Sequence, residues 1–246
     1  MESTLWTTTV IILPKWNTDL NFLRIVTLLP SLASDQRFIF FILKHNKLGG
    51  DEVGFGCWKS NPNITAWMKE HNLTDYAKLE EIWITQIINI TETNSFDYIV
   101  WEEVFNNGIN INKNTVVEVW LPYHPKQETY NVTKAGYRAL ISAPWYLDLI
   151  SYGADWHSYY NYEPLDFNGT AAQEALVMGG EACLWAEFVD ASNYVSRLFP
   201  RASAVAERLW SAREVSRDKS GRRSVREENV RVRLHIYGYR YTDTDQ

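Results

Sequence analysis

Leu48-Gly49-Gly50-Asp51-Glu52-Val53 is the stretch that decides the fold and chemistry expected for this 246-residue chain. The glycine pair lets the backbone bend sharply and approach a ligand closely. Two adjacent carboxylates follow at once, so acid chemistry is expected at Asp51 and Glu52. An isolated string of this kind is also typical of an acidic turn at a helix N-terminus. Its meaning therefore depends on the residues around it.

Short apolar runs that lead to tryptophan follow this stretch along the chain. The runs are Tyr98 to Trp101, Val116 to Trp120, Ala139 to Ser142 before Trp145, and Ala182 to Trp185. They alternate with helix-like segments, and this alternation favours an α/β fold in which helices wrap a parallel sheet. In a β/α barrel, residues at the carboxyl ends of the strands point into the site. The side chains expected to converge there are Glu52, Trp101, Trp120, Tyr146 and Trp185.

Two helices are expected from the spacing of apolar residues. Thr74 to Ile90 is the clearer one, with Thr74 as a plausible N-cap. Its apolar residues at helical spacing are Tyr76, Leu79, Trp83, Ile87 and Ile90. The second helix is expected at 201–211, with Ala202, Val205 and Leu209 on one face.

Six blocks, in order along the chain, resemble glycoside hydrolase family 20, specifically its lysosomal-type β-N-acetylhexosaminidases. The blocks are 48–53, 57–62, 100–105, 142–148, 179–185 and 200–210. The resemblance implies a partial (β/α)8 TIM barrel, approximately strands 4 to 8, because the family's fourth strand ends at the acid pair. Three preceding βα units would need about 90 residues at about 30 residues each, whereas only 50 residues precede Asp51.

This comparison of lengths predicts three regions. Residues 1–46 are expected to be a non-family N-terminal segment, 47–212 a partial catalytic barrel, and 213–246 a basic divergent tail. The open edges of half a barrel favour aggregation. We therefore expect poor independent stability unless another polypeptide supplies the missing strands.

The resemblance also implies catalytic roles. In this family the 2-acetamido group of the substrate is the nucleophile. Glu52 is then the general acid and later the base, and Asp51 receives the acetamide N–H and stabilises the positive charge that develops there. Tyr146 donates a hydrogen bond to the acetamide oxygen.

Substrate-binding residues are implied in the same way. Trp101, Trp120 and Trp185 match the indoles that wall the terminal sugar, although core packing would be the better interpretation of any one of them alone. Asp148 and Glu187 match acceptors for the outer hydroxyls of that sugar, although either alone would pass as a solvated loop charge. An acidic residue at 148 should also repel a 6-sulfate, so neutral terminal N-acetylhexosamine is the expected substrate.

Composition and motifs limit which cofactors and partners are expected. No cofactor and no metal are expected, because His45 and His124 lack a spaced cluster of further ligands. The net charge of −6 and the absence of an aromatic-interleaved basic motif argue against nucleic acid. No transmembrane segment is expected, since the apolar run 38–43 is far too short. The expected partners are glycans or glycolipids ending in N-acetylhexosamine, and a homo- or heterodimer as in the intact family.

Five Asn-X-Thr sequons indicate a lysosomal or secreted protein, as does the family resemblance, although the start of the chain lacks a convincing signal peptide. The sequons lie at Asn63, Asn72, Asn89, Asn131 and Asn168. The two cysteines permit no disulfide framework to be read.

The function predicted from these observations is retaining, substrate-assisted hydrolysis of terminal non-reducing N-acetylhexosamine. The family's sugar-gripping arginine, and an aspartate and a histidine from its early strands, have no counterpart in this sequence. A catalytically incomplete fragment acting as a sugar-binding or subunit-interaction module is therefore the alternative. A misassembled reading frame that never folds is a third hypothesis.

Overall fold

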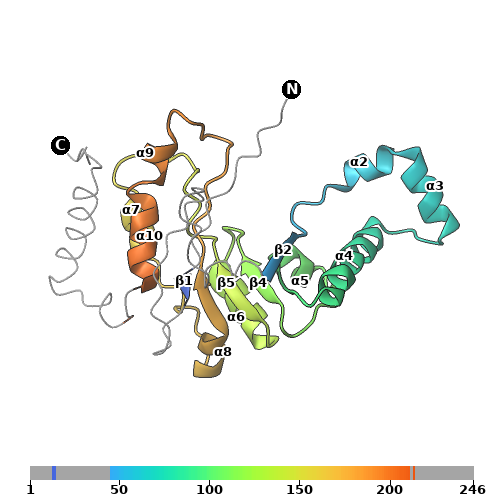
Figure 1. The fold of residues 1–246 in the computed structure, drawn as a ribbon, viewed down its shortest axis with the longest axis horizontal. Helices are drawn as coiled ribbons and strands as arrows, with labels where there is room; N and C mark the ends of the chain where they lie inside the picture. The colour runs from blue at the N-terminus through green and yellow to red at the C-terminus, as the bar shows by residue number, and fades with distance from the viewer. Residues whose placement is uncertain (1–12, 15–44, 211–212, 214–246) are drawn as a thin grey trace.

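A computed structural model describes residues 13–14, 45–210 and 213. Its six strands form one sheet in the order β1-β6-β5-β4-β3-β2, shown in Figure 1. The strands are β1 Leu13–Pro14, β2 His45–Gly49, β3 Asp97–Trp101, β4 Val116–Val119, β5 Arg138–Ile141 and β6 Val177–Gly180. Strands β2 to β6 run parallel to their neighbours, and β1 pairs antiparallel with β6. The expected α/β fold with a parallel sheet is confirmed.

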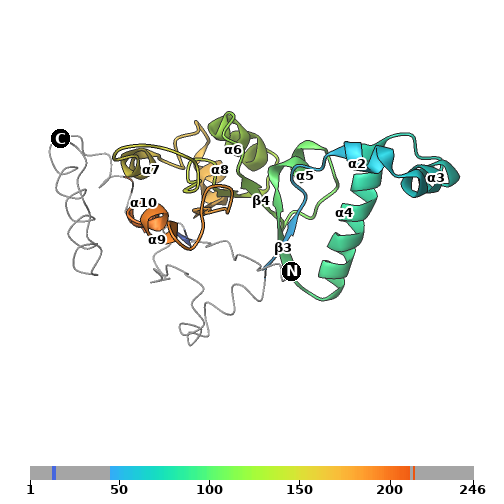
Figure 2. The same ribbon diagram turned by 90° about the horizontal axis from the view of Figure 1, so that it is seen from above.

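Helices connect these strands and cover one face of the sheet. They are α2 Phe55–Ser60, α3 Pro62–Glu70, α4 Tyr76–Thr93, α5 Glu102–Asn106, α6 Pro125–Lys134, α7 Trp156–Asn161, α8 Ala171–Leu176, α9 Tyr194–Leu198 and α10 Arg201–Trp210. In both views α7 and α10 lie toward β1, whereas α2 and α3 extend beyond the β2 side (Figures 1 and 2). Among the described residues, no helix is long and apolar enough to cross a membrane.

The two faces of the sheet differ in chemistry, because successive side chains of a strand point to opposite faces. On one face, strand residues such as Val100, Val117 and Ile141 pack with helix residues in the main hydrophobic core. On the other face, Ile99, Val116 and Leu140 form a second and smaller cluster, with Met178 packed against it. This second face also carries charged side chains near the carboxyl ends of the strands, and the candidate site lies there.

Helix α4 corrects the expected helix at 74–90 in two respects. The N-cap is Asp75 rather than Thr74, and its carboxylate accepts a hydrogen bond from the Ala77 N–H at 2.9 Å. The buried apolar side chains of α4 are Ile84 and Ile88, whereas Trp83 is 52% exposed and Ile90 is 64% exposed.

Helix α10 follows the expectation more closely. It spans Arg201–Trp210, and Ala202, Val205 and Leu209 are buried together on its inner face. The face predicted for this helix is confirmed.

The apolar run Ala182 to Trp185 is not the strand that the pattern suggested. Strand β6 lies earlier, at Val177–Gly180, and the later run is an irregular segment joined to the sheet by an isolated bridge between Cys183 and Tyr146. The Cys183 N–H donates to the Trp145 carbonyl at 2.9 Å, and the Leu147 N–H donates to the Cys183 carbonyl at 2.7 Å. This bridge holds together the segments that follow β5 and β6.

Most of the predicted N-terminal segment and basic tail lies outside the described residues. His45 and Asn46, placed at the end of the predicted N-terminal segment, belong to strand β2. Cys57 is exposed and Cys183 is buried, and both are free thiols.

Candidate active site

The eight side chains predicted to form the site lie at one edge of the sheet, at or after the carboxyl ends of β2 to β6. Asp51 and Glu52 follow β2, Trp101 ends β3, Trp120 follows β4, Tyr146 and Asp148 come after β5, and Trp185 and Glu187 come after β6. In parallel α/β sheets this edge is where ligands bind. The topology therefore gathers residues that are up to 136 positions apart in sequence (187 − 51).

The acid pair sits in the irregular segment that joins β2 to α2, directly after the two glycines. Gly49 and Gly50 have positive φ angles of 76° and 98°, and Glu52 also lies in the left-handed region with φ 50°. A side chain at position 50 would place its Cβ 2.3 Å from Cγ2 of Val104 in α5, so only glycine fits there. This segment leaves both Asp51 and Glu52 exposed to solvent.

Glu103, at the start of α5, lies between the segment that carries Asp51 and Glu52 and the aromatic residues. Its carboxylate accepts a hydrogen bond from Nε1 of Trp120 at 2.8 Å. Burial raises the pKa of Glu103 and the charge of Asp51 adds to the rise, whereas the Trp120 donor and the nearby backbone N–H of Glu52 oppose it. Glu103 lies within one of the six family-like blocks, but no role was predicted for it.

Glu102 fixes the backbone on the other side of Trp120. It is buried and accepts hydrogen bonds from the N–H groups of Trp120 at 2.9 Å and Leu121 at 3.4 Å. Burial raises the pKa of Glu102 to about 7, although the two backbone donors oppose the rise. The loop after β4 is therefore held by one buried carboxylate.

An aromatic wall, defined as Trp101, Trp120, Tyr146 and Trp185, runs along this edge. The rings of Trp101 and Trp120 meet edge to face with centroids 5.7 Å apart, and Trp120 and Tyr146 lie 6.0 Å apart at 32°. The Trp185 side chain lies near enough to the Tyr146 hydroxyl to affect its pKa. Burial raises the pKa of Tyr146, and nearby Cys183 and Glu118 raise it further, so the phenol keeps its proton.

Asp148 and Glu187 lie near the Trp185 end of the wall in different environments. Asp148 is buried, with the Trp185 backbone N–H near enough to affect its pKa, whereas Glu187 is exposed. Burial raises the pKa of Asp148, the negative charge of Glu187 adds to the rise, and Arg197 opposes it. The two carboxylates are thus near enough to influence each other.

An ion cluster, defined as Lys47, Glu118 and Glu181, lies beside the wall and was not predicted. Both carboxylates are buried, whereas the Lys47 side chain is 33% exposed. The ammonium of Lys47 is 2.8 Å from Oε2 of Glu118 and 2.9 Å from both carboxylate oxygens of Glu181. The same ammonium lies 4.7 Å from the centroid of the Trp101 ring. Burial and the charge of Glu181 raise the pKa of Glu118 to about 8, against the attraction of Lys47.

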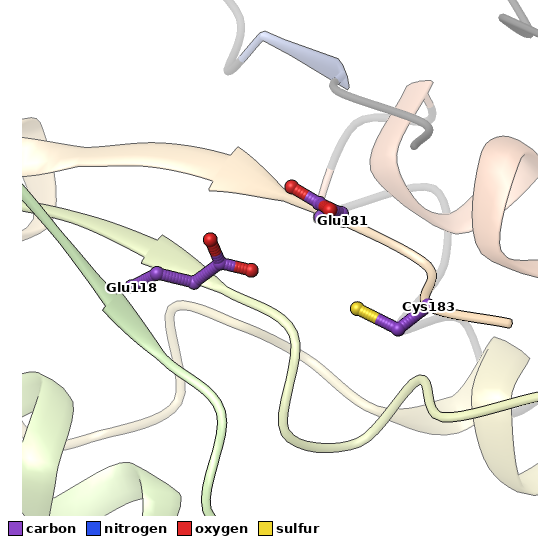
Figure 3. A group of neighbouring side chains, drawn as sticks. All are labelled: Glu118, Glu181 and Cys183. Atoms are coloured by element: carbon purple, nitrogen blue, oxygen red, sulfur yellow. The ribbon is translucent and has the colours of Figure 1, made fainter. Parts of the chain in front are cut away.

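Among the described residues, one group has the chemistry to ligate a metal. Ligand atoms of Glu118, Glu181 and Cys183 all lie within 4.8 Å of one another, and Figure 3 shows the three side chains pointing toward a common point. Burial raises the pKa of the Cys183 thiol, and the Lys47 ammonium already contacts both carboxylates. The Lys47 ammonium is therefore the cation that pairs with the two carboxylates.

Comparison with known proteins gives the family. Residues 25–213 match the model described as glycosyl hydrolase family 20, catalytic domain. The chain belongs to glycoside hydrolase family 20. This membership is consistent with an acid pair that follows a strand and is bordered by an aromatic wall, the arrangement of the described site.

Relatives within family 20 agree over the same part of the chain. A rat protein named β-hexosaminidase subunit alpha is 52% identical over 168 residues, which cover 67% of this chain and 32% of the relative. A mouse β-hexosaminidase subunit beta is 54% identical over 170 residues, covering 69% of this chain and 32% of the relative. The chain thus spans about a third of the length of these relatives.

Solved family 20 structures resemble the fold described above. The structure of a Flavobacterium johnsoniae chitobiase matches with a TM-score of 0.61 and 28% identity, and it covers 78% of this chain and 29% of that one. The matched region again corresponds to part of a larger family 20 protein.

Proposed function

We propose that this chain carries the acid-bearing half of a β-N-acetylhexosaminidase catalytic domain. The five parallel strands β2 to β6 would be strands 4 to 8 of a (β/α)8 barrel, and residues 47–212 would be the partial catalytic domain. The observation that carries the proposal is the position of Glu103, whose carboxylate accepts a hydrogen bond from Trp120 and lies close enough to Asp51 and Glu52 for both to affect its pKa. This supports an acid pair beside an aromatic wall suited to a sugar face.

The proposed reaction is retaining and substrate-assisted. Glu52 protonates the glycosidic oxygen as it leaves, while the carbonyl oxygen of the 2-acetamido group attacks the anomeric carbon. Asp51 accepts the acetamide N–H and stabilises the positive charge that forms on the resulting oxazoline-type ring. Water, deprotonated by Glu52, then opens that intermediate with net retention.

Tyr146 is proposed to hold the acetamide group in line for this attack. The raised pKa keeps its hydroxyl protonated, so the hydroxyl can donate to the acetamide oxygen. The neighbouring indoles of Trp120 and Trp185 would pack against the sugar and exclude water. Holding reacting groups in one geometry in this way lowers the entropic part of the barrier.

Asp148 and Glu187 are proposed to accept hydrogen bonds from the outer hydroxyls of the terminal sugar. Ionised acceptors give stronger hydrogen bonds than neutral ones. The substrates expected are glycans or glycolipids that end in neutral N-acetylhexosamine. The curated relatives are named as alpha and beta subunits, so we also propose that the intact protein is a homo- or heterodimer.

A lysosomal or secreted location is proposed from the family and from the five sequons. The asparagines of all five sequons are exposed, as glycan attachment requires.

Sulfated substrates test the role of Asp148. A 6-sulfate beside an ionised Asp148 should lower kcat/KM about tenfold or more relative to the plain sugar, because like charges brought together are unfavourable. Since burial raises the pKa of Asp148, this discrimination should grow as the pH rises through that pKa. Asp148→Asn should reduce it. Equal turnover of the two substrates by the unmodified chain would refute the assignment.

The alternative function is a sugar-binding or subunit-interaction module without turnover. It is favoured by the exposure of Asp51 and Glu52, which the described residues do not enclose. Sugar affinity without hydrolysis would establish it.

Release of a fluorophore from its N-acetyl-β-glucosaminide tests the enzymatic proposal. The unmodified chain should turn this substrate over at mildly acidic pH, and Glu52→Gln should lower kcat by at least about a hundredfold, the size of a general acid contribution. Glu70→Gln, at an exposed position at the end of α3, is the matched control and should leave kcat unchanged. A folded Glu52→Gln variant with full turnover would contradict the proposal.

A further inference from the structure

The ion cluster has no part in the proposed chemistry, although it lies directly beside the site. Glu118 and Glu181 are fully buried, on β4 and immediately after β6. Lys47 reaches them from β2, at the other side of the sheet from β6. Two buried carboxylates without a cation would be strongly unfavourable. The Lys47 ammonium therefore satisfies both and ties three separate strands together.

The geometry fixes this ammonium in space. A lysine side chain has a flexible four-carbon stem, so one contact leaves its position loosely defined. Here the ammonium has Glu118 on one side at 2.8 Å and both oxygens of Glu181 on another at 2.9 Å. Because the carboxylates are buried within the sheet, they hold the ammonium at one place.

The fixed ammonium in turn contacts the aromatic wall. It lies over the Trp101 ring, 4.7 Å from the centroid, within the range of a cation–π interaction. Trp101 is 8% exposed and meets Trp120 edge to face. Movement of the Lys47 ammonium would therefore change the position of Trp101 and, through it, the aromatic wall.

We propose that Lys47 is a positioning residue for the sugar pocket, whose ammonium, held by Glu118 and Glu181, sets the orientation of the Trp101 indole and so preforms the aromatic wall. The inference rests on the proposed function only in taking the wall to bind a sugar. It assigns the ion cluster to substrate binding, whereas a cluster that only joined the strands would affect stability alone.

Lys47→Met tests this inference, because methionine keeps much of the side-chain length and removes the charge. Trp101 would contact the sugar in both the ground state and the transition state, so its displacement raises KM more than it lowers kcat. We expect KM to rise about tenfold, between the values of an exposed and a desolvated cation–π contact, because the Lys47 side chain is partly exposed. Lys47→Arg keeps the charge and should recover most of the affinity.

Lys113→Met is the matched control. Lys113 also lies over an aromatic ring, 4.1 Å from the centroid of Tyr137, but it precedes β4 at the opposite edge of the sheet. Removing its charge should leave KM unchanged. A folded Lys47→Met variant with unchanged KM would overturn the inference.

A second variant separates positioning from folding. Lys47→Met leaves two buried carboxylates without their cation, so the triple variant Lys47→Met, Glu118→Gln, Glu181→Gln removes the negative charges as well. It should fold and keep the raised KM, because Trp101 still lacks its ammonium. A triple variant with the KM of the unmodified chain would overturn the inference and leave the cluster a purely stabilising role.

The orientation of Trp101 can also be followed without catalysis. The indole N–H resonance of Trp101, assigned by its loss in Trp101→Phe, should shift in Lys47→Met and in the triple variant and stay unchanged in Lys113→Met. An unchanged resonance in both Lys47 variants would refute positioning by Lys47. Absence of turnover by the unmodified chain would instead refute the proposed function, so the two failures are distinguishable.

Discussion

Burial separates the acid pair from three glutamates at the carboxyl edge of the sheet. Asp51 and Glu52 are exposed to solvent. Glu102, Glu118 and Glu181 are buried, and buried carboxylates need hydrogen bonds or an ion-pair partner. Glu102 has the backbone donors after β4, and the other two share Lys47. The buried glutamates stabilise the strands and the loop beside the exposed acid pair.

Glu102 predicts a pH dependence of stability. Its folded pKa is raised to about 7 from an ordinary value of 4.5, so the folded state binds this proton more tightly than the unfolded chain. The stabilisation is fully present below about pH 4.5 and is lost as the pH rises to about 7. The free energy of unfolding in urea should therefore fall between pH 5 and pH 8, with Glu102 contributing on the order of 2 kcal/mol.

Glu102→Gln is the informative variant, because its amide oxygen still accepts from the Trp120 N–H. The fall in unfolding free energy should be smaller than in the unmodified chain, and the remainder is expected from Glu118, whose pKa is raised to about 8. Glu70→Gln serves as the exposed control. An identical fall in all three proteins would contradict the account of Glu102.

Sequence reasoning located the exposed acid pair but not the buried residues that support it. Asp51 and Glu52 adjoin a glycine pair, and that local pattern is visible in one stretch. Lys47 and Glu181 are 134 positions apart and meet only across the folded sheet. One signal was present: Glu118 interrupts the apolar run Val-Val-Glu-Val, and a charge inside a fully buried strand requires a partner.

The bounds and buried faces of helices and strands could be predicted where local capping and packing determine them. The face of α10 was found because its small and apolar residues recur at helical spacing. In α4 the choice of N-cap depended on one position, since Thr74 and Asp75 are both favourable residue types there. Strand β6 was placed too late because two of its four residues are glycines, which are depleted in strands.

The N-cap of α4 gives a prediction at this scale. Asp75→Ala removes the acceptor for the Ala77 N–H and should lower the free energy of unfolding by about 1 kcal/mol. Thr74→Ala, one residue earlier, should change it by less than about 0.5 kcal/mol. Urea denaturation of the two variants side by side measures the difference. A larger loss of unfolding free energy in Thr74→Ala than in Asp75→Ala would show that Thr74 is the N-cap, as the sequence first suggested.

At the scale of the whole molecule, the candidate site exists only when the sheet is formed. Its residues come from the ends of five parallel strands, and the bonds through Glu103 and Lys47 cross between segments far apart in sequence. The fold class followed from alternating strand-like and helix-like segments. The family follows from the match over residues 25–213. The chain spans about a third of the length of the curated relatives it matches.

The measurement that tests the central claim most directly is kcat for a series of fluorogenic substrates whose 2-acetamido group carries no, one, two or three fluorines. Fluorine withdraws electrons from the amide oxygen and makes it a weaker nucleophile, while the sugar and the leaving group stay the same. If that oxygen attacks the anomeric carbon with Glu52 as the acid, kcat falls with each fluorine added. Values of kcat that stay constant across the series, or no turnover of any member, would contradict the account.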